Sequence, residues 1–242
     1  MANDGGRIPF NLALSSGVLL KRYKRFLADI RLDSGEEITA HCANSGAMTS
    51  CVEPGAKVWV SDSNNPKRKL RYTWELIRMT DSWVGVNTAN PNRLVTTWTE
   101  MGAFSEFESY SKVRREVKYG EGNRSRIDIL LSEGKGVADC YVEIKNATLR
   151  VDDAVAFPDA VTTRGQKHIR DLVSVVEDGH RGVLFFFVGR TDCSYFRPAD
   201  EVDKEYGRLL REAVDVGVEV IVQEVDCLPE GFSLGRRLEL SL

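Results

Sequence analysis

The chain has 242 residues, of which 42% are hydrophobic and 29% charged, and its formal net charge is −3. This composition excludes a disordered chain, and the length suits one large domain or two modest ones. No apolar run approaches the ~18 residues of a membrane span, and the opening MANDGGRIPF lacks the pattern of a secretory signal. We therefore expect a cytoplasmic protein.

The cysteines and histidines do not form a recognisable metal or disulfide pattern. The five cysteines are scattered without a CxxC motif, and the three histidines are dispersed. His41 and Cys42 are adjacent, but neighbouring residues on a strand point to opposite faces, which disfavours a nucleophile with its base. Reduced thiols in a cytosolic protein fit this usage best.

The first part of the chain is rich in short strands. Turn residues such as those of Ser63–Pro66 separate the segments VLLKRY, FLADIRL, EITAHC, KVWVSD, KLRYTWELIRM and SWVGVN. Five or six short strands without a long helix predict a small β-barrel, which we assign to residues 1–90. Two clumps of cations, KRYKR and PKRKLRY, lie within it, each around a tyrosine.

Residues 91–242 have a different pattern, in which helices and strands mix. NRLVTTWTEM predicts a helix that leads into the strands SKVRREVKY, SRIDILL and ADCYVEIK. In QKHIRDLVSVVEDG, Ile169, Leu172, Val173 and Val176 fall on one helical face. The apolar run RGVLFFFVG predicts a strand covered on both faces, and the helix DKEYGRLLREAVDVG and strand VEVIVQEV follow. The predicted fold class is therefore α/β (α+β).

Three charges interrupt the predicted hairpin SRIDILLSEGKGVADCYVEIKNATL. Ile127, Ile129 and Leu131 share one face of the first strand, and matching them to the apolar face of the second strand fixes the register in steps of two. Asp128, Glu143 and Lys145 then all project from the opposite face. If Asp128 lies opposite Tyr141 or Glu143, the two carboxylates come within about 5 to 8 Å of each other.

Two carboxylates at that separation repel, and a divalent cation would relieve the repulsion. Mg²⁺ or Mn²⁺ uses one or two protein carboxylates and takes its other ligands from water and phosphate oxygens, while a nearby lysine can stabilise charge on the phosphate. Asp128, Glu143 and Lys145 have the spacing of the PD-(D/E)xK nuclease site, with Asp128 and Glu143 as metal ligands. The alternative is an exposed strand face with a Glu–Lys ion pair. Glu116 is a further candidate acid, although a surface role suits it better.

The helix after this motif carries polar residues near its N-terminal end, where the helix dipole favours anions. Arg164 and Arg170 add positive charge there. In several PD-(D/E)xK nucleases the corresponding helix contributes polar residues to the site. That resemblance makes Gln166 a catalytic candidate and Lys167 a DNA-binding candidate.

Several long motifs together resemble the sugar fermentation stimulation protein (SfsA) family. In order, they are RYKRFLADI, HCANSGAM, NPKRKLRYTWEL, VGVNTANPN, SRIDILL, YVEIKNATL and FPDAVTTRGQKHIRDL. The resemblance implies a prokaryotic protein with an N-terminal OB-fold domain, a C-terminal PD-(D/E)xK nuclease-like domain, and DNA binding. Ala43, Ser45 and Ala47 depart from the family pattern, and so does Ile144 between the motif Glu and Lys. These departures leave the acids and the lysine intact and the role of the Asn44–Gly46 loop open.

An OB fold gives the cation clumps a function, because OB folds combine cations along the nucleic-acid backbone with aromatic side chains that stack on bases. The alternative is a solvated strand face with a charged loop. No base-reading motif is visible, so binding should be largely non-specific and salt-dependent. The candidate DNA contacts are Lys21, Arg22, Tyr23, Lys24, Arg25, Lys67, Arg68, Lys69, Arg71 and Lys167.

Two functions remain open at this point. The first is a DNA-binding protein that carries a nuclease-like metal site and, as the family name suggests, influences sugar-utilisation genes. The second is a Mg²⁺- or Mn²⁺-dependent nuclease that hydrolyses DNA or RNA. Both need a nucleic-acid partner and neither needs a membrane.

Overall fold

The computed structural model describes residues 6–80, 82–120, 122 and 125–242. Its first part is a β-barrel whose strands follow the order β3-β2-β1-β4-β5-β6. A parallel bridge between His41 and Thr73 joins β3 to β5 and closes the barrel. The strands are β1 (Leu14–Tyr23), β2 (Leu27–Leu32), β3 (Glu37–His41), β4 (Lys57–Asp62), β5 (Tyr72–Arg78) and β6 (Trp83–Gly85).

Alternating apolar residues fill the barrel, as expected for strands with one buried face. Leu19, Ile30 and Val58 are fully buried in its core. Trp74 is also fully buried there, so its ring is not available to stack on a base. Because β5 begins at Tyr72, the second cation clump lies in the loop between β4 and β5 and not on a strand.

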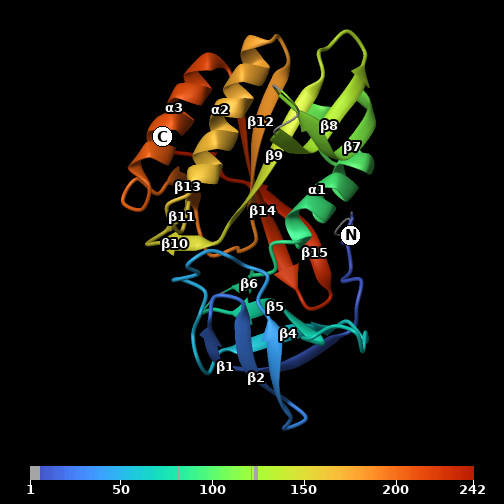
Figure 1. Cartoon of the computed structure of the whole chain (residues 1–242), viewed down its shortest axis with the longest axis vertical. Coiled ribbons are helices and arrows are strands. Elements are labelled where there is room, and N and C mark those ends of the chain that lie inside the picture. The colour runs from blue at the N-terminus through green and yellow to red at the C-terminus, as the bar shows by residue number, and fades with distance from the viewer. Residues whose placement is uncertain (1–5, 81, 121, 123–124) are drawn as a thin grey trace.

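A mixed α/β domain lies above the barrel in Figure 1, built around a six-stranded sheet of order β15-β14-β12-β9-β8-β7. Its strands are β7 (Tyr110–Tyr119), β8 (Ser125–Gly134), β9 (Cys140–Ala147), β12 (Arg181–Val188), β14 (Glu219–Leu228) and β15 (Gly231–Arg237). A four-stranded sheet beside it contains β10 (Leu149–Val151), β11 (Ala154–Phe157), β13 (Tyr195–Pro198) and β16 (Glu239–Leu240). The predicted fold, an OB barrel followed by a mixed α/β domain, is confirmed.

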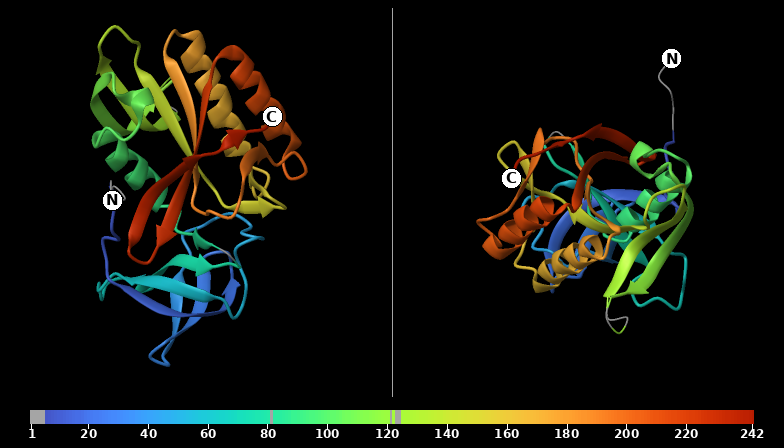
Figure 2. Two further views of the ribbon diagram at one scale, coloured as in Figure 1. Left: turned by 180° about the vertical axis from the view of Figure 1, so that it is seen from behind. Right: turned by 90° about the horizontal axis from the view of Figure 1, so that it is seen from above.

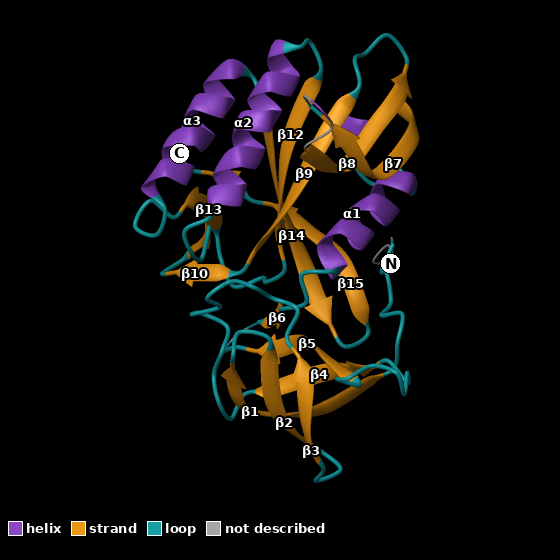
Figure 3. Cartoon of the chain, in the orientation of Figure 1, coloured by secondary structure: helices purple, strands orange, loops and turns teal. Residues whose placement is uncertain are grey.

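Helices cover both faces of the large sheet (Figure 3). The helix α1 (Asn90–Glu100) packs on one face, while α2 (Thr163–Glu177) and α3 (Lys204–Val216) lie side by side on the other. A short 3₁₀ helix, η1 (Ser105–Phe107), follows α1. In the described part of the chain, no helix is long and apolar enough to cross a membrane.

The predicted parity of the hairpin is largely confirmed. Ile129, Leu131 and Val142 lie in the core that α1 covers, and Ile129 is paired with Val142 in the ladder between β8 and β9. The prediction is wrong for Ile127, which is buried in the core on the α2 side. The β8–β9 pairing ends at Ile129. Beyond that point the side chains of β8 need not alternate between the two faces in step with those of β9.

The two domains share an apolar core. Leu76 of the barrel is buried in the same cluster as Leu94 of α1 and Phe185 of β12. The segment before the barrel also joins the second domain, because Ile8 and Phe232 exchange backbone hydrogen bonds of 2.9 Å. Figure 2 shows β14 and β15 reaching down to the barrel from behind. The barrel is therefore fixed against the α/β domain, and the loop between β3 and β4 runs along the junction.

Candidate functional site

Asp128 lies where β8 leaves β9. Its Oδ2 accepts the backbone N–H of Ile144 at 2.7 Å, and its Oδ1 accepts the side-chain amide of Asn92, from the first turn of α1, also at 2.7 Å. Continuing the register of Ile129 with Val142 by one residue sets Asp128 opposite Glu143. The carboxylate therefore replaces the missing ladder partner of β9 and stands beside the second acid.

Glu143 is the centre of a compact ion cluster. The Lys145 ammonium lies 2.6 Å from Glu143 Oε1, and the side chains of these residues are only 11% and 4% exposed. His168 of α2 contacts the same oxygen through Nδ1, and its Nε2 accepts a hydrogen bond from Arg164 at 3.3 Å. The Lys145 ammonium also lies 3.0 Å from His168 Nδ1, so the carboxylate, the ammonium and the imidazole are in mutual contact.

The environments of the two acids push their pKa values apart. Burial, followed by the nearby charge of Glu143, raises the pKa of Asp128 to about 6. Burial opposes ionisation of Glu143 too, but hydrogen bonds and charges from His168 and Lys145 outweigh it and lower the pKa of Glu143. Asp128 is thus the acid that a proton or a cation can most readily neutralise.

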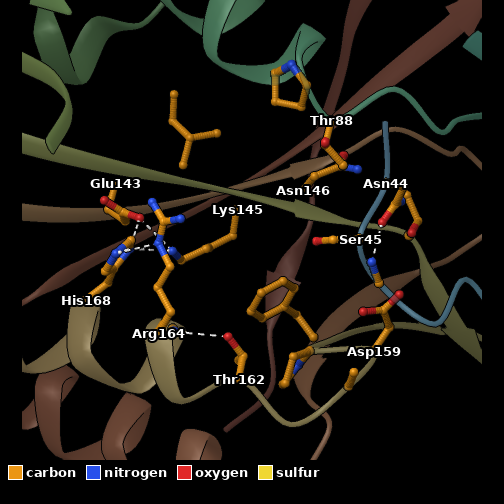
Figure 4. A pocket seen from close by; sticks show the side chains of 18 of the residues that line it. Asn44, Ser45, Thr88, Glu143, Lys145, Asn146, Asp159, Thr162, Arg164 and His168 are labelled. Atoms are coloured by element: carbon orange, nitrogen blue, oxygen red, sulfur yellow. Dashed lines mark hydrogen bonds and ion pairs between the residues drawn. The ribbon is translucent and has the colours of Figure 1, made fainter. Parts of the chain in front are cut away.

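These groups line a cavity of about 510 Å³ at the junction of the domains. In Figure 4, Glu143, Lys145 and His168 point toward one another on one side, and Asn44 and Ser45 lie on the other. Three segments that are distant in the sequence form the walls. They are the barrel residues Arg25 and Asn44–Gly46, the connection Thr88–Asn92, and the stretch from Phe157 to His168.

The donor set fits a cation that brings most of its own ligands. Asp128 and Glu143 supply carboxylates to one cavity, and within the described ranges no three His, Cys, Asp or Glu side chains group as metal ligands. Mg²⁺ and Mn²⁺ accept such incomplete protein shells, because water and substrate phosphate complete them. Structural zinc, which requires four protein ligands, does not fit.

Two residues predicted for this site lie elsewhere. Gln166 was expected to be catalytic, but its side-chain amide donates to both carboxylate oxygens of Asp203, at 3.0 and 3.1 Å, beneath the start of α3. Lys167 forms an ion pair with Asp171 at 2.6 Å and lines a second cavity. On α2 the face that meets β9 carries Arg164 and His168, since residues four apart lie above one another.

The first cation clump is divided between structural and accessible roles. Arg22 donates to the carbonyls of Asn44, Gly46 and Ala47 at 2.9 to 3.0 Å, so it holds the β3–β4 loop instead of facing solvent. Lys21 lies 3.4 Å from Asp29.

The Tyr23 hydroxyl donates to the same Asp29 carboxylate at 3.2 Å. Lys24 and Arg25 are exposed at the turn, and Arg25 lines the main cavity. Of this clump, the turn therefore offers the accessible cations nearest the site.

The second clump lies in the β4–β5 loop, apart from the residues that line the cavity. Arg71 is held by Asp62, with Nε 2.8 Å from Oδ1, and Arg68 donates to the Thr73 hydroxyl at 3.3 Å. Lys67 and Lys69 are exposed. DNA contact by this loop remains a prediction.

Glu116, the further candidate acid, lies at the surface of β7. Its carboxylate is 3.6 Å from Arg126 and its side chain is 48% exposed. The structure therefore does not bring Glu116 into the cavity.

The sequence patterns do not indicate the contributions of His168, Asn92 and the Asn44–Gly46 loop. His168 could have been found, because it lies on the predicted helix four residues after Arg164. Asn92 shows no comparable pattern. The loop is placed by tertiary contacts, among them the Met48 N–H, which donates to Asp159 at 3.0 Å.

Comparisons with known proteins agree across nearly the whole chain. The model described as "SfsA N-terminal OB domain" matches residues 20–86, and "Sugar fermentation stimulation protein RE domain" matches 89–231. A sugar fermentation stimulation protein homolog of Geotalea uraniireducens is 49% identical over 231 residues, which cover 96% of this chain and 98% of that protein. The homolog of Geobacter sulfurreducens is 52% identical over 225 residues, which cover 93% of this chain and 95% of that protein.

A solved structure shows the same fold. It is described as "The structure of Pyrococcus Furiosus SfsA in complex with Ca2+" and matches with a TM-score of 0.87 at 24% identity, covering 98% of this chain and 100% of that chain. Together with the two family models and the relatives at about half identity, the finding is unambiguous: the chain belongs to the sugar fermentation stimulation protein family.

Proposed function

We propose that the protein is a metal-dependent phosphodiester hydrolase that binds and cuts nucleic acid, with DNA as the foremost candidate. The convergence of Asp128, Glu143 and Lys145 in one accessible cavity carries this proposal. Two acids and a lysine at this spacing suit phosphodiester hydrolysis, which needs a cation site beside a positive charge. The barrel supports nucleic-acid binding by its fold.

Asp128 and Glu143 would hold a divalent cation, Mg²⁺ or Mn²⁺. When bound, such a cation polarises a phosphate oxygen and lowers the pKa of water. The Ca²⁺ complex of the related Pyrococcus furiosus protein supports a divalent-cation site in this fold. The hard oxygen donors of the two carboxylates suit all three ions.

The chain's own residues supply charge and position. Lys145 is held against Glu143, so its ammonium is kept at the cavity wall and can stabilise negative charge on a phosphate. His168 orients the Glu143 carboxylate through Nδ1, and Arg164 fixes the imidazole. Asn92 and the Ile144 N–H fix Asp128 in the same way. The site is therefore preorganised before substrate arrives.

The ion cluster also supports a second candidate, DNA binding without hydrolysis. Glu143 Oε1 already meets Lys145 and His168, so the buried carboxylate is compensated within the protein. A domain that only binds DNA would therefore be stable with Glu143 paired to Lys145 and His168 and with no metal bound. A role in the expression of sugar-utilisation genes rests on the family name alone.

The test is cleavage of labelled single- and double-stranded DNA and RNA in Mg²⁺, Mn²⁺ or EDTA. We expect cleavage with metal, none in EDTA, and a loss of at least about 100-fold in Lys145→Ala. Lys112→Ala is the matched control, because Lys112 forms an ion pair of the same 2.6 Å length with Glu133 on the exposed surface of this domain. This control should cleave like the wild type.

Uncut DNA that is still bound by the wild type in both metals would favour the binding protein. Equal loss of cleavage in Lys145→Ala and Lys112→Ala would remove the catalytic role of Lys145. Cleavage that persists in EDTA would contradict the metal dependence.

A further inference from the structure

The turn between β1 and β2 has an unusual backbone. Lys24 and Arg25 adopt the left-handed conformation, with φ angles of 47° and 64°. This conformation costs about 1 kcal/mol for a residue with a Cβ, and glycine or asparagine serves more easily there. The turn therefore keeps a strained backbone while it carries two exposed cations in place of glycine.

Arg22 fixes this turn to the loop that walls the cavity. Its Nε donates to the Arg25 carbonyl at 3.1 Å, while its other nitrogens hold the carbonyls of Asn44, Gly46 and Ala47. Asp159 anchors the same loop from the α/β domain. The turn and the loop thus form one rigid wall, and Arg25 lines the cavity from it.

Arg164 lines the same cavity from the start of α2. Both Arg25 and Arg164 are exposed. The cavity therefore has cations from both domains in addition to Lys145. Exposed arginines at a cavity wall suit phosphate groups, which their planar forks bind in a bidentate manner.

An exposed aromatic ring follows Arg25 directly. Phe26 is 45% exposed, and its ring lies beside that of His41, with an interplanar angle of 26° and centroids 6.5 Å apart. His41 therefore supports the ring from one side. An exposed, supported ring beside a cation is the combination on which unpaired bases stack in OB folds.

We infer that Arg25 and Phe26 of the β1–β2 turn form a single-strand binding subsite for DNA. Arg25 contacts a phosphate neighbouring the one at Asp128 and Glu143, and Phe26 stacks on an unpaired base. This inference rests on the proposed function, since it places the scissile phosphate at the acids. The main nucleic-acid contact of the barrel then lies at the end that meets the α/β domain and not on the strand faces.

The subsite favours a single strand because its stacking contact needs an unpaired base. A base inside a duplex is already stacked on both faces and is not available to Phe26. Arg25 and the two acids line the same cavity. A strand with unpaired nucleotides reaches both Arg25 and the acids.

The charge contact is tested with Arg25→Asn against Lys24→Asn. Both variants lose one exposed cation from the same turn, and asparagine tolerates the backbone that both positions share. Binding of a fluorescent dT12 strand is measured by anisotropy in Ca²⁺ over a range of salt, with the strand checked to be intact. Arg25→Asn should weaken binding about 5- to 10-fold and lower the salt slope by about 0.7. Lys24→Asn should change affinity less than about twofold.

Neutral methylphosphonate linkages locate the contact along the strand. Placed one at a time, they should reveal one linkage that weakens wild-type and Lys24→Asn binding and has no effect in Arg25→Asn. If every linkage that weakens wild-type binding stays equally sensitive in Arg25→Asn, or if the two variants lose affinity equally, the assignment of Arg25 is overturned.

The stacking contact is tested with Phe26→Ala. We expect about 5- to 100-fold weaker binding of dT12 and little change with a duplex. Leu12→Ala is the control, because Leu12 is also an exposed apolar residue before β1, at 43%. Equal effects on single strand and duplex would overturn the subsite.

The hydrolase proposal and the subsite proposal can be contradicted independently of each other. A wild type that binds dT12 with the Arg25 and Phe26 dependence but never cuts would overturn the hydrolase and support the subsite. A wild type that cuts while Arg25→Asn and Phe26→Ala bind and cut normally would overturn the subsite and support the hydrolase.

Discussion

The two basic clumps of the barrel and the ion cluster of the α/β domain place their charges in opposite ways. Apart from Arg22, the cations of the clumps are exposed, and there Lys21 pairs with Asp29 and Arg71 with Asp62. The α/β domain buries Glu143 together with Lys145. Pairs exposed to water contribute little to stability, whereas buried charges require compensation and therefore have defined positions.

This contrast shows which charges report on a site. A cluster of lysines and arginines in the sequence is compatible with a solvated surface, an ion pair or a bound backbone carbonyl. An acid buried within an apolar strand is not compatible with a solvated surface, because burial of an uncompensated charge is costly. Its partners must therefore lie close by, as Lys145 and His168 do at Glu143. Variants at buried and at exposed charges therefore show which group contributes more to metal and DNA binding.

The largest effect should follow from removing Asp128. We expect Asp128→Ala to weaken Mn²⁺ binding by at least about 100-fold, because one of two carboxylate ligands is lost. Isothermal calorimetry measures this. Asp159→Asn is the control, because it neutralises another acid of the same cavity. Equal heats for wild type and Asp128→Ala would place the metal elsewhere and break the contrast between the domains.

The second effect concerns the barrel. Arg22→Ala should lower the free energy of unfolding by about 2 to 3 kcal/mol, since several carbonyls lose a charged donor. Lys21→Ala, at the neighbouring position, should cost less than about 0.5 kcal/mol, because Lys21 is 64% exposed. Chemical denaturation gives both values. Similar costs for the two variants would show that the Arg22 contacts do not hold the loop.

Much of the fold and part of the site follow from local sequence patterns. The alternation in β8 and β9 predicts that Asp128, Glu143 and Lys145 share a face, and the structure confirms that they share a cavity. The helical period predicts α2. Such patterns depend on neighbours a few residues apart, which a sequence displays directly.

The rest of the site depends on contacts between distant residues. Gln166 and His168 lie on the same predicted helix, and the position of α3 decides that Gln166 contacts Asp203. Arg22 and Arg25 belong to one basic clump, and the left-handed turn gives them different roles. Hydrophobic periodicity contains neither the helix-to-helix contact nor the turn, so the sequence could not rank these residues.

The third effect is a dependence on pH. Because the pKa of Asp128 is raised to about 6, protons should compete with the metal for this carboxylate below that pH. Above that pH the carboxylate is ionised and available to the metal. We expect Mn²⁺ affinity to be constant above about pH 7 and to fall toward tenfold per unit below about pH 6. Calorimetry in a series of buffers measures the midpoint. A midpoint near pH 4 would mean that Asp128 behaves as an exposed acid.

The smallest effect should come from the exposed β4–β5 loop. Lys67→Ala combined with Arg68→Ala should weaken dT12 binding about two- to threefold and lower the salt slope by at most about 1.4, the value for two lost phosphate contacts on a single strand. The reason is that both side chains lie outside the cavity and would contact DNA only at the surface. Anisotropy titrations over a range of salt compare this pair directly with Arg25→Asn. A larger loss in the pair would make the loop the main DNA contact of the barrel, and would show that exposed cations can outweigh a cation fixed at the cavity.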